Sequence, residues 1–135
     1  MTRYLLDTNI VSDLVRNPDG TVAERIGRVG DAKVCTSIIV AAELRFGAEK
    51  KGSKRLTDQI ATVLGAMEIL PFAPPADASY ALIRSTLEKA GRPMGANDLL
   101  IAAHAVTLGC TLVTDNEHEF HRVRGLSAEN WLRRR

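Results

Sequence analysis

Four acidic residues stand where the surrounding sequence is strongly apolar. Asp7 follows the run "YLL", and Asp115 follows the run "TLVT" near the other end of the chain. Glu43 and Asp98 lie within segments of helical period, "VAAELRFG" and "ANDLLIAAHA". A carboxylate in such surroundings is costly unless a partner compensates its charge. Asp7 and Asp98 alone each fit a helix cap or a first-turn residue beside the helix dipole, but the set of four acids indicates a site.

Carboxylates held close together repel one another, so a cluster of four needs a cation or raised pKa values. The hard cations Mg²⁺ and Mn²⁺ suit such a cluster, because they take carboxylate oxygens together with water and substrate phosphate. We expect Asp7, Asp98 and Asp115 to hold the metal. We expect Glu43 to bind a second ion or to orient a water molecule that attacks the substrate phosphate.

The elements that must position these acids alternate along the chain. Strand-like segments occur at 4–6, 33–37, 68–72 and 111–114, and helical segments at about 9–16, 21–29, 38–51, 53–67, 74–91 and 96–109. This alternation predicts one α/β domain over residues 1–135, with a mostly parallel central sheet and helices on both sides. Ligands of such sheets bind beyond the carboxyl ends of the strands, which is where Asp7 and Asp115 lie.

Several polar residues beside the acids can orient carboxylates or metal-bound water, although the same residue types also cap helices and form turns. They are Thr8, Asn9, Thr114 and Asn116. The fourth acid is favoured at Asp115, because that residue follows its strand directly. Asn116 and Glu119 are close enough in sequence to share or replace its role.

Composition favours a single soluble domain, with 135 residues of which 45% are hydrophobic and 25% charged. No segment reads as a signal peptide or as a bilayer-spanning helix, so we expect a cytoplasmic protein with no membrane partner. Cys35 and Cys110 are far apart in apolar surroundings, which favours reduced core residues. His104, on an apolar helix, is expected to be a hydrogen-bonded packing residue.

The formal net charge is +2, from 18 basic and 16 acidic residues. If metal neutralises four of the acids, 18 basic groups face 12 acidic ones, and this surplus suits a polyanionic substrate. The C-terminal run Arg133–Arg135 supplies three of these 18 basic residues, although it also fits a disordered tail. The candidates to bind a phosphate backbone lie near the acids in sequence, and they are Arg45, Lys50, Lys51 and Arg92.

Four separated segments appear in an order that resembles a known family. "YLLDTNIVSDL", "AAELRFGAEK", "GRPMGANDLLIAAHAVTLGCTLVTDNEHEF" and "VRGLSAENW" are similar to the VapC toxins, which are PIN-domain ribonucleases of VapBC toxin–antitoxin modules. The resemblance implies a PIN domain, Mg²⁺- or Mn²⁺-dependent endoribonuclease activity and neutralisation by a VapB-type antitoxin. It assigns the family's acidic positions to Asp7, Glu43 and Asp98, and it also implies a homodimer. Its implied substrate is tRNA, including initiator tRNA cut in the anticodon loop.

Two other functions fit parts of the pattern. A phosphatase of the haloacid dehalogenase type also has an Asp after its first strand, but it would need an acid where this chain has Asn9. A non-catalytic binding domain would fit an incomplete acid set, whereas this sequence supplies all four acids. In a metal nuclease, in-line attack by water leaves a 5′-phosphate and a 3′-hydroxyl, because no ribose 2′-oxygen acts as the nucleophile.

Overall fold

The computed structural model describes residues 2–132, so Met1 and the run Arg133–Arg135 lie outside the described residues. Within residues 2–132, the strands are β1 (Tyr4–Leu6), β2 (Val34–Ser37), β3 (Glu68–Leu70), β4 (Thr111–Val113) and β5 (Ala128–Glu129). The helices are α1 (Thr8–Arg16), α2 (Thr21–Val29), the 3₁₀ helix η1 (Asp31–Lys33), α3 (Ile38–Lys51), α4 (Lys54–Gly65), α5 (Ala76–Lys89), α6 (Ala96–Leu108) and α7 (Glu117–Phe120).

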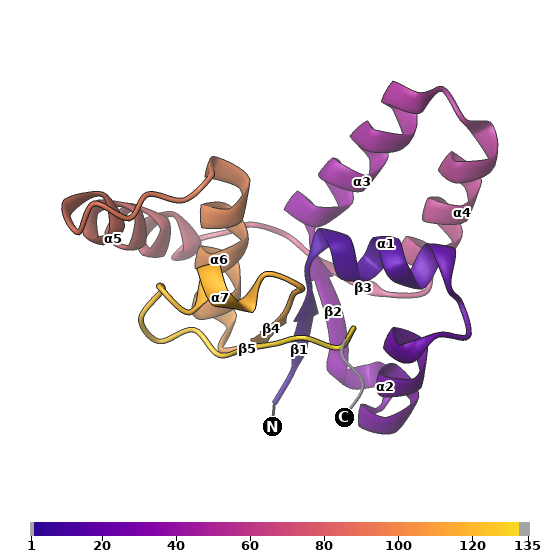
Figure 1. Cartoon of the computed structure of the whole chain (residues 1–135), viewed down its shortest axis with the longest axis horizontal. Helices are drawn as coiled ribbons and strands as arrows, with labels where there is room; N and C mark the ends of the chain where they lie inside the picture. The colour runs from indigo at the N-terminus through magenta and orange to yellow at the C-terminus, as the bar shows by residue number, and fades with distance from the viewer. Residues whose placement is uncertain (1, 133–135) are drawn as a thin grey trace.

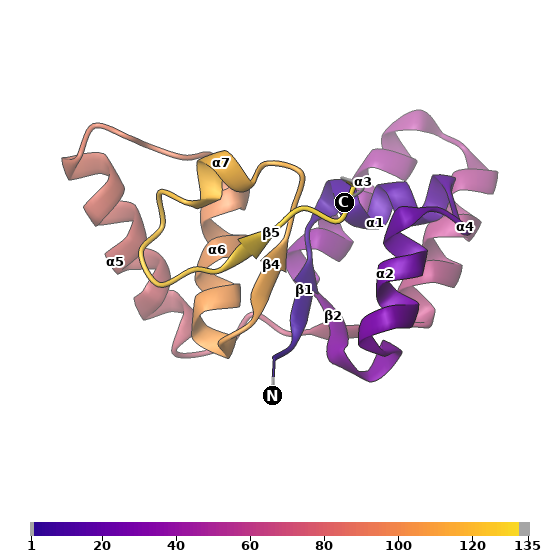
Figure 2. The same cartoon turned by 60° about the horizontal axis from the view of Figure 1, so that its bottom comes forward.

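The five strands form one sheet in the order β3-β2-β1-β4-β5, and every pair is parallel. Leu5 in the central strand is opposite Cys35 on one side and Leu112 on the other. Helices α1 to α4 lie on one face of the sheet, and α5 to α7 lie on the other (Figures 1 and 2). The predicted α/β architecture, a parallel sheet with helices on both sides, is therefore confirmed.

The strand order places a crevice at one point of the sheet edge. The chain runs from β1 outward to β2 and β3, and it then returns across the sheet to β4 on the other side of β1. In open parallel sheets, ligands bind outside the carboxyl ends of the strands where the order reverses in this way. Here that point lies between the ends of β1 and β4, which lead into Asp7 and Thr114.

Helix ends follow the capping residues of the sequence. The Ser37 hydroxyl accepts a hydrogen bond from the Ile39 N–H at 3.0 Å and caps α3. Gly109 ends α6 with a φ of 68°, a left-handed conformation that glycine adopts without strain. At α1, however, Thr8 is the first helical residue and the cap is Asp7. The Asp7 carboxylate accepts the Thr8 N–H, so Asp7 and not Thr8 caps this helix.

Two short elements near the C-terminus have no counterpart among the predicted segments. The helix α7 is a single turn, and β5 has two residues that pair with β4. Helix α4 is shorter than the predicted segment 53–67, since Ser53 is its cap and β3 follows soon after Gly65. Elements this short have too few residues to show the hydrophobic periodicity of a helix or a strand.

The core fills both faces of the sheet, and α6 is its most deeply buried helix. His104 in α6 lies with its Nδ1 atom 2.7 Å from the Ser37 hydroxyl oxygen, which confirms the predicted packing role. Cys35 and Cys110 are both free and buried, as expected for reduced core residues. No helix among the described residues is long and apolar enough to cross a membrane.

Candidate active site

Asp7 lies between β1 and α1 and is fixed by contacts from the end of β4 and from the first residue of α1. Its N–H donates to the Val113 carbonyl at 2.9 Å. One carboxylate oxygen accepts the Thr8 N–H at 2.8 Å, and the other accepts the Thr114 hydroxyl at 2.8 Å. The residue is only 6% exposed. The side chain is therefore held in one position at the crevice between β1 and β4.

Burial raises the pKa of Asp7 above its ordinary value, and the charges of Glu43 and Asp115 raise it further. The hydrogen bonds from Thr114 and Thr8 act in the opposite direction, but they do not outweigh burial. A buried carboxylate that faces other acids is an unusual choice for a residue that only caps a helix. This environment favours a functional role for Asp7 in addition to its capping role.

Glu43 in α3 is held by two other helices. Its Oε1 atom accepts the Thr8 hydroxyl at 2.7 Å, and its Oε2 atom accepts the Asn97 side-chain amide at 3.0 Å. Sequence reasoning missed Asn97. The available signal was its position beside Asp98 at the start of a helix, but only the fold shows that its amide reaches α3.

Asp98 lies in the first turn of α6, where it meets the other acids. Burial raises the pKa of Asp98 to about 6, and the charges of Asp7, Glu119 and Glu43 contribute in that order. A carboxylate at a helix N-terminus is usually stabilised by the helix dipole. The raised pKa reflects burial first and then repulsion by these three acids, both of which oppose the dipole effect.

Asp115 and Glu119, the two candidates for the fourth acid, are each held by an asparagine. Both Asp115 oxygens accept the Asn9 side-chain amide, at 3.1 and 3.2 Å. The Glu119 carboxylate accepts the Asn116 amide at 2.7 Å. Asp115 is exposed and contributes to the raised pKa of Asp7, whereas Glu119 contributes to that of Asp98.

All the polar residues named from sequence as supporting the acids contact one of them. Thr8 donates to Glu43, Asn9 to Asp115, Thr114 to Asp7 and Asn116 to Glu119. The Thr114 hydroxyl also accepts the Asn116 N–H at 3.1 Å, so it links Asp7 to the turn that follows β4. These residues therefore orient carboxylates as well as forming turns and helix starts.

The donor set suits a hard cation. In residues 2–132, the five acids Asp7, Glu43, Asp98, Asp115 and Glu119 form no ion pair with lysine or arginine. All of their donor atoms are oxygens, the type that Mg²⁺ and Mn²⁺ prefer. Within the same residues, no three His, Cys, Asp or Glu side chains form a group arranged to hold a metal ion. The residues thus fit a divalent cation in chemistry and charge, while ligation by three of them requires side-chain adjustment.

The four basic residues named from sequence are all exposed, and they come from α3 and from the connection between α5 and α6. Lys51 lines a groove that begins at Thr8 and Glu43. Arg45 and Lys50 lie on α3 without lining this groove, and Arg92 lies in the connection between α5 and α6.

Comparison with known proteins identifies the family. Residues 4–126 match the PIN domain family. Ribonuclease VapC2 of Haemophilus influenzae (strain ATCC 51907 / DSM 11121 / KW20 / Rd) is 38% identical over 133 residues, which cover 98% of this chain and 100% of the relative. The tRNA(fMet)-specific endonuclease VapC of Shigella flexneri is 36% identical, with 97% and 99% covered. The crystal structure of VapBC2 from Rickettsia felis bound to a DNA fragment of its promoter superposes with a TM-score of 0.88 at 33% identity, over 96% of this chain and 99% of that one. The chain belongs to the PIN domain family and, within it, to the VapC ribonucleases.

Membership of this family removes the phosphatase and the non-catalytic domain from consideration. The site gives a physical reason against the phosphatase. Asn9, at the position where that class needs an acid, uses its amide to donate to both oxygens of Asp115. An aspartate at this position would have no hydrogen to donate and would repel Asp115 instead.

Proposed function

We propose that this chain is a toxin endoribonuclease that hydrolyses RNA phosphodiesters with Mg²⁺ or Mn²⁺, and that a VapB-type antitoxin neutralises it. The observation that carries the proposal is the convergence of Asp7, Glu43 and Asp98 at the crevice between β1 and β4, with raised pKa values at Asp7 and Asp98. The VapC relatives, which are named as ribonucleases, support the reaction class.

Asp7, Asp98 and Asp115 would hold the cation. When bound, a divalent ion supplies Lewis-acid polarisation of the scissile phosphate and lowers the pKa of water. Asp7 is prepared for this task because Thr8 and Thr114 fix both of its oxygens before substrate arrives. Preorganised oxygens need no reordering when the cation binds.

Glu43 is suited to orient the attacking water. Each of its oxygens accepts one hydrogen bond, from Thr8 or Asn97, and each keeps a free lone pair. A water that donates to Glu43 would be aimed at the phosphate opposite the leaving 3′-oxygen. The products would be a 5′-phosphate and a 3′-hydroxyl.

We propose tRNA as the substrate, with initiator tRNA as the first candidate. Relatives from Shigella flexneri and Salmonella typhimurium are named tRNA(fMet)-specific endonucleases, at 36% and 32% identity. An anticodon loop exposes unstacked bases and accessible phosphates, which an A-form helix does not. The protein would act in the cytoplasm, where tRNA functions, and as a homodimer.

A cleavage assay with the purified full chain tests the metal-nuclease proposal. Transcribed initiator tRNA should be cut with Mg²⁺ or Mn²⁺ and left intact with chelator. Asp7→Asn and Asp98→Asn should lower the rate at least a hundredfold while the circular dichroism spectrum stays native, because each removes a ligand charge and little volume. Asp77→Asn is the matched control, since Asp77 is an exposed first-turn acid of α5. Full cleavage in chelator, or by either site variant, would contradict the proposal.

A further inference from the structure

We propose that the groove between α1, α3 and α4 binds one unpaired nucleotide of the RNA next to the cleavage point, with Arg16 and Lys51 contacting its phosphates. The inference rests on the proposed function and adds a nucleotide subsite to it. The groove has a volume of about 300 Å³ and is lined by residues of all three helices. Pockets for small ligands begin at about this size, which suits a single nucleoside.

The groove begins at the candidate active site. Thr8 and Glu43 line it, and the Thr8 hydroxyl donates to the Glu43 carboxylate at 2.7 Å. A strand whose phosphate lies at the acids therefore has the groove as its neighbouring subsite. The negative charge of Glu43 would oppose a phosphate at this end, so the basic side chains must act further along the groove.

The floor of the groove is aliphatic. It is formed by Val15, Leu44, Leu56 and Ile60. An apolar floor can pack against the flat face of a base, because this contact removes the apolar surface of both from water. In an A-form helix the base faces are stacked on one another, so only an unpaired nucleotide can present one. The aliphatic floor thus favours a loop over a duplex.

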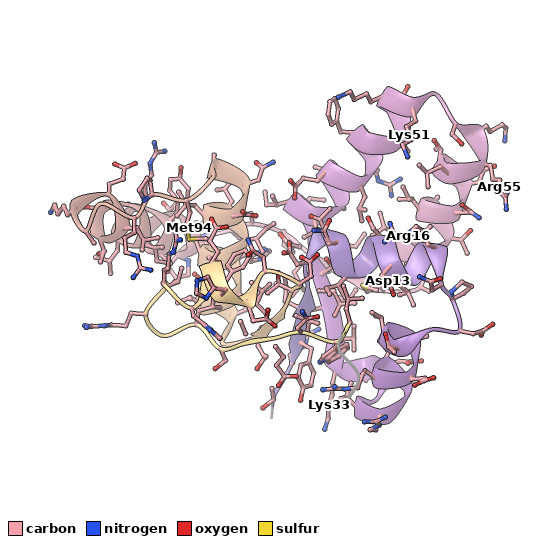
Figure 3. The ribbon with its side chains drawn as sticks, viewed as in Figure 1. Asp13, Arg16, Lys33, Lys51, Arg55 and Met94 are labelled. Carbon is pink, nitrogen blue, oxygen red and sulfur yellow. The ribbon has the colours of Figure 1, made fainter. Side chains whose placement is uncertain are left out.

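The rim of the groove carries two cationic side chains. Arg16 is the last residue of α1 and Lys51 the last residue of α3, and both are exposed (Figure 3). In the described part of the chain, neither forms an ion pair. Basic residues at helix ends often only complement the helix dipole. These two come from different helices and still line the same groove, which is the arrangement that a phosphate backbone requires.

Gly47 leaves the room for the base. It lies in α3 and lines the groove, and a Cβ atom added there would meet nothing within 4 Å. A larger side chain at this position can therefore enter the groove without a clash at its Cβ. Leucine also has a higher helix propensity than glycine, so Gly47→Leu should not destabilise α3.

RNA binding tests the charged rim. Every protein carries Asp7→Asn to prevent cleavage, since asparagine also caps helices well. Binding of a fluorescein-labelled ten-nucleotide single-stranded RNA is followed by anisotropy at several salt concentrations with Mg²⁺. Arg16→Gln and Lys51→Gln together should weaken binding about tenfold, and each should reduce the slope of log K against log salt by ~0.7. Arg55→Gln is the control, because Arg55 lies on α4 but does not line the groove (Figure 3).

The same assay tests the floor. Gly47→Leu should weaken binding about tenfold and leave the salt slope unchanged, because it removes space without removing charge. Gly65→Leu is the matched control, since Gly65 also has free space around an added Cβ and lines no part of the groove. Thermal unfolding measured by circular dichroism should show no loss of stability in either variant.

The outcomes separate the groove from the proposed function. Unchanged RNA binding by the Arg16, Lys51 and Gly47 variants would overturn the subsite, and so would an equal loss in Arg55→Gln, which would indicate a general charge effect. Unchanged RNA binding combined with weaker antitoxin binding would assign the groove to the antitoxin and also overturn it. Failure of the wild-type chain to cleave tRNA with Mg²⁺ or Mn²⁺ would instead contradict the nuclease activity.

Discussion

Asp7 shows that a structural and a chemical role can belong to one carboxylate. It caps α1 through the Thr8 N–H, and it also faces Glu43 and Asp115 in the crevice. Asparagine would keep the cap but would remove the charge. Helix capping therefore does not explain why this charge is buried beside other acids, whereas the cation proposed for the site would explain it.

The fourth acid can be assigned by comparing two conservative variants. Asp115→Asn should reduce RNA cleavage at least tenfold and more than Glu119→Gln, because Asp115 adjoins Asp7 at the end of β4. Higher metal concentration should partly restore the Asp115 variant if metal affinity is what it lost. Initial cleavage rates over a range of Mn²⁺ concentrations give the ranking. A larger loss in Glu119→Gln would assign the role to Glu119, and small equal losses would point to Asn116 and water.

The raised pKa of Asp98 predicts that the folded protein without metal is less stable at neutral pH than at acidic pH. Its folded pKa of about 6 lies above the ordinary value of 3.8. The stability linked to this group is therefore fully present below about pH 4 and is lost as pH rises through about 6. In chelator at pH 7, Asp98→Asn should raise the melting temperature by a few degrees, and the gain should disappear at about pH 4.

The measurement is thermal unfolding of both proteins in chelator across this pH range. Saturating Mg²⁺ should reverse the ranking at pH 7, because metal that binds only the folded wild-type protein stabilises it. An Asp98→Asn variant that melts below the wild type in chelator at pH 7 would show that the helix dipole outweighs burial and repulsion.

At the scale of elements, the sequence predicted the long helices well and the short C-terminal elements not at all. The ranges 21–29 and 38–51 match α2 and α3, because Ser37, Gly52 and the turn before Thr21 mark their ends locally. The two residues of β5 become a strand only through pairing with β4, which no local pattern records. Local sequence patterns miss contacts of the site for the same reason. Asn97 reaches Glu43 only because α6 packs beside α3.

Ser37 joins two elements, and this predicts an unusually costly substitution. Its hydroxyl caps α3 and also contacts the buried His104 of α6. Ser37→Ala should lower the free energy of unfolding by about 2–4 kcal/mol, since a lost cap costs about 1 kcal/mol and an unsatisfied buried group adds about 1–3 kcal/mol. Ser53→Ala, which removes only the cap of α4, should cost about 1 kcal/mol. Urea unfolding gives both values, and equal losses would mean that the His104 contact contributes nothing.

At the scale of the whole molecule, the acids come from both sides of the sheet and face no arginine or lysine partner within residues 2–132. Without metal, this cluster attracts a guanidinium, which can satisfy two carboxylate oxygens at once. A second groove, of about 480 Å³, lies between α2 and α4, on the face of the sheet that also carries the groove between α1, α3 and α4. Ile26, Val63 and Met67 give it an apolar lining that suits one side of an amphipathic helix.

These two features predict how the antitoxin neutralises the nuclease. An apolar antitoxin helix should occupy the groove between α2 and α4, while an antitoxin arginine reaches Asp7, Glu43 and Asp98 and displaces the metal. Replacing that arginine by alanine should weaken inhibition at least tenfold, and the apparent affinity of the intact antitoxin should fall as Mg²⁺ or Mn²⁺ rises, because arginine and metal compete for the same oxygens. Gly27→Leu, which fills the second groove, should weaken binding equally at every metal concentration. If the antitoxin inhibits equally at all metal concentrations and without any basic residue, displacement of the metal by arginine is contradicted. Steric blocking of the RNA path would then be the remaining mechanism.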